Sequence, residues 1–314
     1  MTKIPENFKE IMVKNYGSKV ENWVNALPNL LSKSEEIFNI HHLRPFEDLS
    51  YNYVADGMVG HLPVVLKLSF EKEALKREKD VLKAFEGRGT VRVLDYNEKL
   101  GALLLEKVVP GKSLANMGED QKEVKQFCQV FKRLHQTQVN VNSEGVPTLV
   151  EWFAALKRYR EIEGTTGDIP EEEMTLAEIL LEELIQTTID PVLMHGDLHH
   201  GNILENQGGG WKVIDPKGLF GDIHFETIQY LLNYIDRQGD PDIVLERRIQ
   251  WMSSYLNLDQ MRIIKWGVVR GILEACWALE NGEDLDKGLE ITNRFRRRLR
   301  LLAEVKEIDN NCYF

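Results

Sequence analysis

Cysteine and long apolar runs are scarce in this 314-residue sequence, and its 39 basic residues are outnumbered by 50 acidic ones. Its three cysteines, Cys128, Cys276 and Cys312, lie far apart, and the first two fall inside apolar helical patterns. This placement favours buried free thiols over a disulfide or a metal cluster. The longest mostly apolar stretch, residues 266–279, is interrupted by two charged side chains and is shorter than the roughly 20 apolar residues that a membrane span needs. We therefore expect no membrane partner.

The first 17 residues also lack the continuous apolar block of a signal peptide, and their pattern is that of an amphipathic helix. A cytoplasmic location is therefore expected. The formal net charge is −11, whereas binding to nucleic-acid phosphates needs a basic surface. The sequence thus argues against a nucleic-acid partner and is compatible with a cationic ligand.

The distribution of apolar residues changes near residue 107. The chain is 43% hydrophobic and long enough for two lobes. Before residue 107, strand-like patterns cover residues 37–43, 51–55, 62–70 and 103–108, with one clear helix at 71–85. After it, helical patterns cover residues 120–137, 149–159, 171–188, 222–236, 241–255, 259–280 and 284–305. We predict an α+β fold with a small β-rich lobe, residues 1–106 with a helical extension at 1–34, and a larger mainly helical lobe, residues 107–314.

Lys67 lies in the middle of the apolar strand pattern LPVVLKLSF, where an unpaired ammonium would cost several kcal/mol in a dry setting. In the helix that follows, Glu78 lies one turn from both halves of the apolar stripe and therefore points inward. The simplest inference is a Lys67–Glu78 ion pair that fixes the ammonium. The alternative is a lysine whose ammonium reaches solvent and a glutamate at the edge of the helix.

Acids, an amide and three histidines are concentrated in VLMHGDLHHGNILENQGGGWKVIDPKG, residues 192–218. Residues 191–195 have the pattern of a short buried strand, and residues 202–214 that of a hairpin which would bring Asn202 and Asp215 together. An amide oxygen and a carboxylate suit Mg²⁺, which keeps several ligands outside the protein. Asp197, off the metal, could accept a proton. This arrangement, with Lys67 adding positive charge, is what phosphoryl transfer requires.

The histidines allow a rival hypothesis, a zinc cluster made by His195, His199 and His200 with Asp197. That hypothesis leaves Asn202 and the other polar residues without a role. We therefore favour packing and hydrogen bonding around the loop as the role of the histidines.

The motifs HGDLHHGN and IDPKG resemble the catalytic and metal-binding loops of the aminoglycoside phosphotransferases, which are relatives of protein kinases. The version with DPKG is similar to the aminoglycoside/hydroxyurea resistance kinase family, which includes streptomycin phosphotransferases. The resemblance implies a protein-kinase-like two-lobed fold and the cofactors ATP and Mg²⁺. The roles that it implies are Asp197 as catalytic base, Asn202 and Asp215 as Mg²⁺ ligands, Lys67 as the contact to the α and β phosphates with Glu78 holding it, and backbone groups of Glu106 to Val108 around adenine.

The sequence departs from the protein-kinase pattern in several places. The loop RPFEDLSYNYV contains no G-x-G-x-x-G, so backbone amides around Ser50 are expected to cover the phosphates. HGD replaces HRD, DPKG replaces DFG, and no A-P-E segment follows. These differences argue against a protein substrate and favour a small hydroxylated molecule.

Acidic side chains offer sites for a cationic acceptor. Asp222 and Glu226 share a predicted helical face and could receive its amino or guanidino groups, although acids in a first helical turn also stabilise the helix dipole. A rim of acids could gather cations, or simply face water: Glu161, Glu163, Asp168 and residues 171–173. The basic stretch RFRRRLR, residues 294–300, has helical spacing and is interpreted as a solvated helix face.

Three functions remain open. The first is transfer of the ATP γ-phosphate to a hydroxyl of a streptomycin-like aminoglycoside. The second keeps this chemistry with a metabolite acceptor, such as an amino alcohol, a sugar or a thiosugar, because one fold can host many acceptors. The third is a non-catalytic nucleotide-binding module, which the joint presence of Lys67, Asp197, Asn202 and Asp215 argues against.

Overall fold

The computed structural model describes residues 4–136 and 145–311, which form two compact units. The first unit comprises Met1–Lys112 and Leu204–Lys217, and the second comprises Ser113–Ile203 and Gly218–Phe314. In this division the segment Leu204–Lys217, which contains Asp215, belongs with the first unit although it lies far beyond residue 106 in the chain. The predicted helix end at residue 137 and Cys312 lie outside the described residues.

The first unit is built on a five-stranded antiparallel sheet with strand order β1-β2-β3-β5-β4. A second sheet has the order β6-β8-β9, and its β8–β9 hairpin confirms the predicted one. The elements are α1 (Glu6–Tyr16), α2 (Glu21–Phe38), β1 (His41–Pro45), β2 (Asn52–Val59), β3 (Leu62–Ser69), α3 (Lys72–Ala84), β4 (Val93–Asn97), β5 (Ala102–Glu106), β6 (Pro110–Ser113), β8 (Ile203–Asn206) and β9 (Gly210–Val213).

The strand predicted at residues 37–43 begins too early. Helix α2 continues to Phe38, and Asn39 ends it in the left-handed region at φ 53° before β1 begins at His41. Asparagine tolerates this conformation better than most residues do. An apolar run across a helix end therefore had the appearance of a strand.

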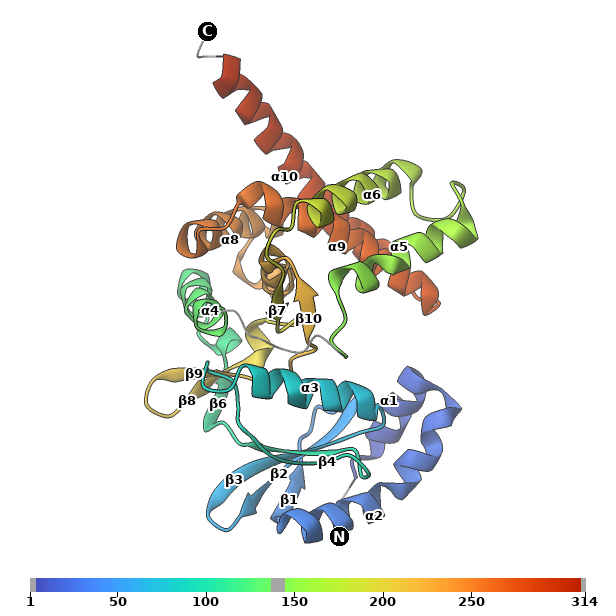
Figure 1. The fold of residues 1–314 in the computed structure, drawn as a ribbon, viewed down its shortest axis with the longest axis vertical. Coiled ribbons are helices and arrows are strands. Elements are labelled where there is room, and N and C mark those ends of the chain that lie inside the picture. The colour runs from blue at the N-terminus through green and yellow to red at the C-terminus, as the bar shows by residue number, and fades with distance from the viewer. Residues whose placement is uncertain (1–3, 137–144, 312–314) are drawn as a thin grey trace. The chain divides into compact units, whose positions relative to one another are not determined.

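The two faces of the five-stranded sheet are covered by different helices (Figure 1). Side chains of α1 and α2 pack with Leu66 and Leu68 of β3, whereas Leu75 and Leu82 of α3 pack on the other face. Since successive side chains of a strand point to opposite faces, Lys67 lies on the side of α3. The strand and helix periods together bring this lysine to the inward face of α3.

The second unit is mainly helical, with one short antiparallel strand pair, β7–β10. Most helices lie where the sequence predicted them. The elements are α4 (Asp120–Leu134), α5 (Leu149–Glu163), α6 (Glu171–Gln186), β7 (Val192–Met194), β10 (Leu219–Gly221), α7 (Ile228–Leu232), α8 (Pro241–Leu256), α9 (Gln260–Glu280), α10 (Asp286–Asn311), and the 3-10 helices η2 (Leu114–Asn116), η3 (His200–Asn202), η4 (Ile223–Thr227) and η5 (Ile235–Gln238).

The single helix predicted at residues 222–236 is wrong. The chain forms η4, α7 and η5 in succession, because Asn233 is extended and Tyr234 adopts the left-handed region at φ 55°. The apolar period therefore continues through a segment whose backbone changes direction.

Helix α9 is the core helix of the second unit, with Trp266 and Ile272 fully buried. It packs closely on α10 through glycine. A Cβ at Gly267 would lie 2.2 Å from the ring of Phe295, and one at Gly271 would lie 2.5 Å from the backbone nitrogen of Thr292. Larger residues at these positions would separate the two helices.

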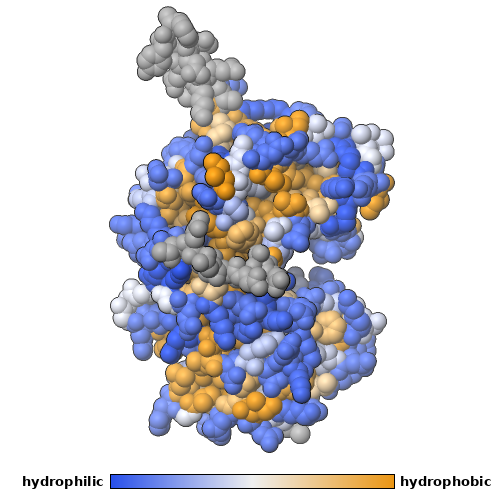
Figure 2. Space-filling view, viewed as in Figure 1, coloured by the Kyte–Doolittle hydropathy of each residue, from blue (hydrophilic) through white to orange (hydrophobic). Residues whose placement is uncertain are grey.

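Hydrophilic residues cover most of the face shown in Figure 2, and hydrophobic residues are exposed in smaller patches. Single exposed apolar side chains such as Ile162 and Ile189 are normal for folded proteins. In the part of the chain that the structure describes, no helix has both the length and the apolar composition to cross a membrane.

Candidate active site

Lys67 is held between two carboxylates of the first unit. Its Nζ lies 2.7 Å from Glu78 Oε2 and 3.0 Å from Asp215 Oδ1. Burial alone lowers the pKa of Lys67, but Asp215 and Glu78 raise it above its ordinary value, so the ammonium stays charged. The predicted Lys67–Glu78 ion pair is confirmed, and the alternative of a solvent-reaching lysine is wrong.

Asp215 follows β9 and has φ 57°, in the left-handed region that aspartate visits more readily than most residues. Its side chain is 48% exposed, whereas those of Lys67 and Glu78 are only 7% and 8% exposed. The Asp215 carboxylate therefore has a solvent-exposed side that can coordinate a hard cation while its Oδ1 pairs with Lys67. This donor chemistry fits the predicted Mg²⁺ ligand.

At the end of β5, two backbone N–H groups already donate hydrogen bonds within the protein. The Glu106 N–H donates to the Arg92 carbonyl and the Lys107 N–H to the Pro63 carbonyl. The Glu106 carboxylate pairs with Arg92 and Lys212; although burial raises the pKa of Glu106, these two cations hold it below its ordinary value. Glu106 therefore fixes the segment with both its side chain and its N–H. Ser50 lies exposed in the loop between β1 and β2.

Asp197 lies in the loop after β7 in the second unit. Gln229 Nε2 donates a 3.0 Å hydrogen bond to Asp197 Oδ1, and the Asp197 N–H donates to His195 Nδ1 at 3.2 Å. The side-chain nitrogen of Asn202 donates to the Asp197 carbonyl at 2.9 Å. Because the Asn202 nitrogen is the group facing its own loop, the amide oxygen is the atom left to act as a metal ligand.

The Glu226 carboxylate fixes the backbone of this loop through hydrogen bonds. Its two oxygens accept hydrogen bonds from the N–H groups of His195 (2.6 Å) and Gly196 (3.0 Å), and its residue is only 2% exposed. Gly196 has φ 78° and lies close to Leu219, so a side chain there would be strained. Direct contact of Glu226 with substrate is therefore a prediction that the structure does not support: Glu226 shapes the loop.

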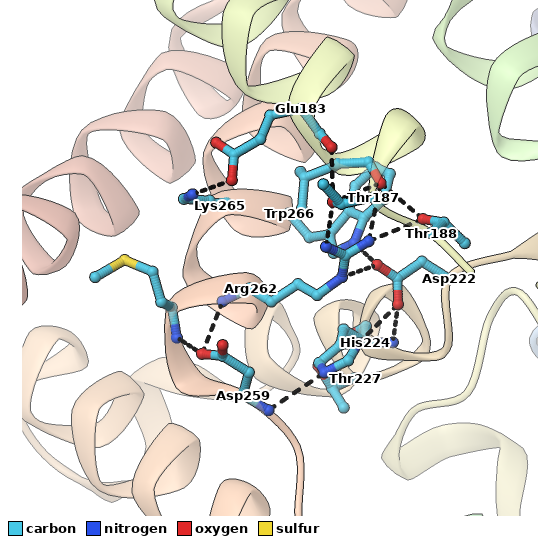
Figure 3. Close-up of polar contacts among 12 residues, drawn as sticks. Glu183, Thr187, Thr188, Asp222, His224, Thr227, Asp259, Arg262, Lys265 and Trp266 are labelled. Carbon is cyan, nitrogen blue, oxygen red and sulfur yellow. Dashed lines mark hydrogen bonds and ion pairs between the residues drawn. The ribbon is translucent and has the colours of Figure 1, made fainter. Parts of the chain in front are cut away.

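Asp222 is likewise buried, at 4% exposure, and is surrounded by donors of the protein (Figure 3). One oxygen accepts from the Arg262 guanidinium and from Trp266 Nε1, and the other contacts His224 Nδ1 at 2.7 Å. Burial raises the pKa of Asp222, but the bonds from His224 and Trp266 lower it to about 2. Its predicted role as a substrate contact is corrected to that of an internal anchor.

The three histidines of the loop have other contacts. His195 and His199 each use Nδ1 to accept a backbone N–H, and His200 stacks on Tyr230 with ring centroids 3.8 Å apart. Burial and the nearby Arg248 lower the pKa of His200 to about 2, so its ring is neutral. Over residues 4–136 and 145–311, no group of three or more histidine, cysteine or acidic side chains could hold a metal ion. The zinc hypothesis has no support in the geometry.

The predicted acidic rim is partly neutralised by the basic stretch. Arg296 of α10 pairs with Glu172 and Glu173, and Arg160 of α5 pairs with Glu171. Further arginines of residues 294–300 pair with acids of α8 and α10. The arginines are therefore paired within the unit rather than only solvated, and Glu171, Glu172 and Glu173 of the rim already have arginine partners.

Gln229 and the supporting role of Glu226 were missed by the sequence analysis. Both lie in the segment predicted as one regular helix, where a glutamine carries no chemical signal of its own. The signal available was an uncharged amide within the apolar run of residues 228–232, which is too common to be informative.

The sequence profile of the aminoglycoside/hydroxyurea antibiotic resistance kinase family matches residues 54–282, which include Lys67, Asp197 and Asp215. The hydroxyurea phosphotransferase of Kitasatospora aureofaciens is 28% identical over 300 residues, covering 90% of this chain and 82% of that protein. The streptomycin 6-kinase of Streptomyces griseus is 26% identical over 289 residues, covering 89% and 92%.

Solved structures show the same fold. A thermostable mutant of aminoglycoside phosphotransferase APH(4)-Ia, in a ternary complex with ADP and hygromycin B, aligns with a TM-score of 0.62. The alignment covers 86% of this chain and 97% of that one at 14% identity. The likeness confirms the predicted α+β, protein-kinase-like fold, with a β-sheet part and a mainly helical part.

Proposed function

The chain belongs to the aminoglycoside/hydroxyurea antibiotic resistance kinase family, and from this premise we propose that it transfers the γ-phosphate of ATP to a hydroxyl of a small, cationic, streptomycin-like acceptor. The family membership confirms the resemblance of HGDLHHGN and IDPKG. We place the reaction in the cytoplasm, where ATP is available.

The observation that carries the proposal is the buried Lys67, held by Glu78 and Asp215. A charged ammonium fixed by two carboxylates is arranged to contact phosphate oxygens rather than to titrate. Its carboxylate partner Asp215 is half-exposed and follows a strand that ends beside it. Binding of a nucleoside triphosphate with Mg²⁺ would use both charges: the Lys67 ammonium for the phosphates and the Asp215 carboxylate for the cation.

Asp197 is the proposed catalytic base, which orients the acceptor hydroxyl and takes its proton. Gln229 and the backbone contacts of Asn202 hold its loop in one conformation. Asn202 and Asp215 would hold Mg²⁺, which, when bound, neutralises charge on the phosphates.

Adenine is proposed to lie against the segment after β5, and the phosphates below the loop that contains Ser50. Because the N–H groups of Glu106 and Lys107 already donate to the carbonyls of Arg92 and Pro63, we propose the Val108 N–H as the donor to the base. The Glu106 side chain then serves to fix the segment and does not contact nucleotide.

The acceptor is proposed from the relatives and from charge. The relatives are named for streptomycin and for hydroxyurea, both small molecules with a hydroxyl group. The net charge of −11 favours a cationic acceptor of the streptomycin kind. A neutral acceptor such as hydroxyurea is the second candidate, because the relative named for it matches as much of the chain.

An acceptor screen tests the proposal. Purified protein with ATP and Mg²⁺ is incubated separately with streptomycin, hydroxyurea, an amino alcohol and a sugar, and ADP release and phosphorylated product are measured. Turnover with streptomycin is expected. Turnover with only the other molecules would replace the acceptor, and nucleotide binding without any turnover would overturn the proposed enzyme.

A further inference from the structure

A cavity of about 270 Å³ in the second unit begins at the side chain that bonds Asp197. Gln229 lines this cavity and also donates to Asp197 Oδ1. The other walls come from η5, α9 and α10. Ligand pockets usually measure roughly 300 Å³ or more, so this cavity suits one ring or one arm of a larger molecule.

Most charges in the cavity wall are already paired. Arg270 lies 2.5 Å from Glu274, and Arg294 lies 2.5 Å from Glu290. Lys287 lies 3.9 Å from Glu274, and its side chain is 77% exposed, so water screens its charge. These wall charges nearly cancel within the cavity.

Asp236 on η5 is the exception. Its exposed carboxylate lines the cavity, and it makes no ion pair or side-chain hydrogen bond with any other residue in 4–136 or 145–311. Because this carboxylate has no cationic partner among the described residues, it can pair with a cationic group of a ligand in the cavity. A guanidinium or ammonium group matches it in charge, and a guanidinium can bond to both oxygens at once.

We propose that this cavity is a recognition subsite for a guanidino or amino arm of the acceptor, with Asp236 as the charge partner. Gln229 joins the subsite to the chemistry: its amide fixes Asp197 Oδ1, so an acceptor docked in the cavity presents its hydroxyl beside a carboxylate held in place. Gln229 is thus a positioning residue. The inference rests on the proposed function, because it takes Asp197 as the base.

The first test replaces Asp236 by asparagine and compares a cationic with a neutral acceptor. In Asp236→Asn, KM for streptomycin is expected to rise about fivefold to tenfold, with kcat within about twofold and KM for hydroxyurea unchanged. The matched control is Asp190→Asn, an exposed aspartate outside the cavity, which makes the same change in net charge. Equal KM values for streptomycin in the two variants would overturn the inference.

Binding separates this inference from the proposed function. Calorimetry with streptomycin, in the presence of ADP and Mg²⁺, should show several-fold weaker binding to Asp236→Asn than to the wild type and to Asp190→Asn. If streptomycin does not bind the wild type, the cationic subsite is wrong. Phosphoryl transfer to hydroxyurea or an amino alcohol by the same preparation would then leave the kinase activity standing.

Gln229 gives the complementary readout. In Gln229→Leu, which removes the donor to Asp197, kcat should fall at least tenfold while KM for streptomycin changes little. Gln229→Glu has the same shape but also lacks the donor, and it should fall at least as far. A rise in KM with unchanged kcat in both variants would contradict the positioning role.

Discussion

Asp197 is fixed by neighbours that each hold a different atom. Gln229 bonds Oδ1, Asn202 bonds the carbonyl oxygen, and His195 accepts the N–H. A carboxylate constrained in this way reacts in one orientation, which lowers the entropy lost on reaching the transition state. The residue is therefore expected to contribute to the rate more than to nucleotide binding.

Asp197→Asn should lower kcat by about 100-fold or more and leave the affinity for ADP and Mg²⁺ within about twofold. The substitution keeps the size of the side chain but removes the group that accepts the proton. Steady-state kinetics and nucleotide calorimetry measure the two effects, with Asp190→Asn as the control. An equal loss of nucleotide affinity would contradict the division of roles.

Substitutions in the buried pair of Lys67 and Glu78 distinguish an effect on stability from an effect on activity. Lys67→Met leaves Glu78 buried without its cation and should reduce the free energy of unfolding by about 3 kcal/mol. Adding Glu78→Leu removes the unpaired charge and should restore most of that loss, because two apolar side chains can replace a buried ion pair. ATP turnover should stay lost in both variants.

Urea unfolding and kcat/KM for ATP provide the two measurements. Recovery of ATP turnover in the double variant would show that Lys67 is a structural residue and not a phosphate contact. The single variant Glu78→Leu completes the cycle and measures the coupling of the two side chains.

Some residue pairings could be predicted from the sequence, and others could not. Lys67 and Glu78 lie 11 positions apart on a strand and the helix that follows it, so two local periods determine that they meet. Besides His224, the partners of Asp222 are Arg262 and Trp266, which come 40 or more positions later on α9. No local pattern distinguishes such a buried acid from one that faces substrate.

At the scale of elements, the segment from Asp222 to Gln238 positions the catalytic loop. The polar side chains of Asp222 and Glu226 point inward, one to α9 and the other to the loop before Asp197. The continuous helix that the apolar period favours is interrupted later in the segment, where Asn233 is extended and Tyr234 adopts the left-handed region. The sequence analysis identified Asp222 and Glu226 as acids on one helical face, but it did not identify the internal partners that they bind.

Asp222→Asn should destabilise the protein by about 3 kcal/mol at neutral pH, because it leaves the Arg262 guanidinium without its buried carboxylate. Urea unfolding at pH 7 measures the loss. Asp190→Asn, on the surface, should change the free energy of unfolding by less than about 0.5 kcal/mol.

The same residue sets a pH dependence. The pKa of Asp222 is about 2 in the folded protein, below its ordinary value of 3.8, so the unfolded chain binds the proton first as the pH falls. Its contribution, about 2 kcal/mol, is complete above about pH 5 and is lost progressively from about pH 5 to about pH 1. Unfolding free energies at pH 5, 4 and 3 should therefore fall less steeply in Asp222→Asn. Parallel slopes in the two proteins would contradict this assignment.

At the scale of the whole molecule, the chain order and the structural units do not coincide. Asp215 lies about two-thirds of the way along the sequence but belongs to the first unit, where it meets Lys67. The pattern of apolar residues located the change from strands to helices, but it could not show that the β8–β9 hairpin belongs to the first unit. That association depends on contacts across 148 positions of the chain.

Ligand binding should report on the proposed metal site through the stability of the whole protein. A ligand that binds only the folded state at 100 times its Kd adds about 2.7 kcal/mol, which raises Tm by roughly 5 °C in a chain of this size. ADP with Mg²⁺ should produce such a shift, and ADP with a chelator a much smaller one. Because Asp215 is a proposed metal ligand and Asp197 is not, Asp215→Asn should lose the Mg²⁺-dependent part of the shift while Asp197→Asn keeps it. A shift that is insensitive to the chelator in the wild type would remove Mg²⁺ from the nucleotide site, whatever the acceptor proves to be.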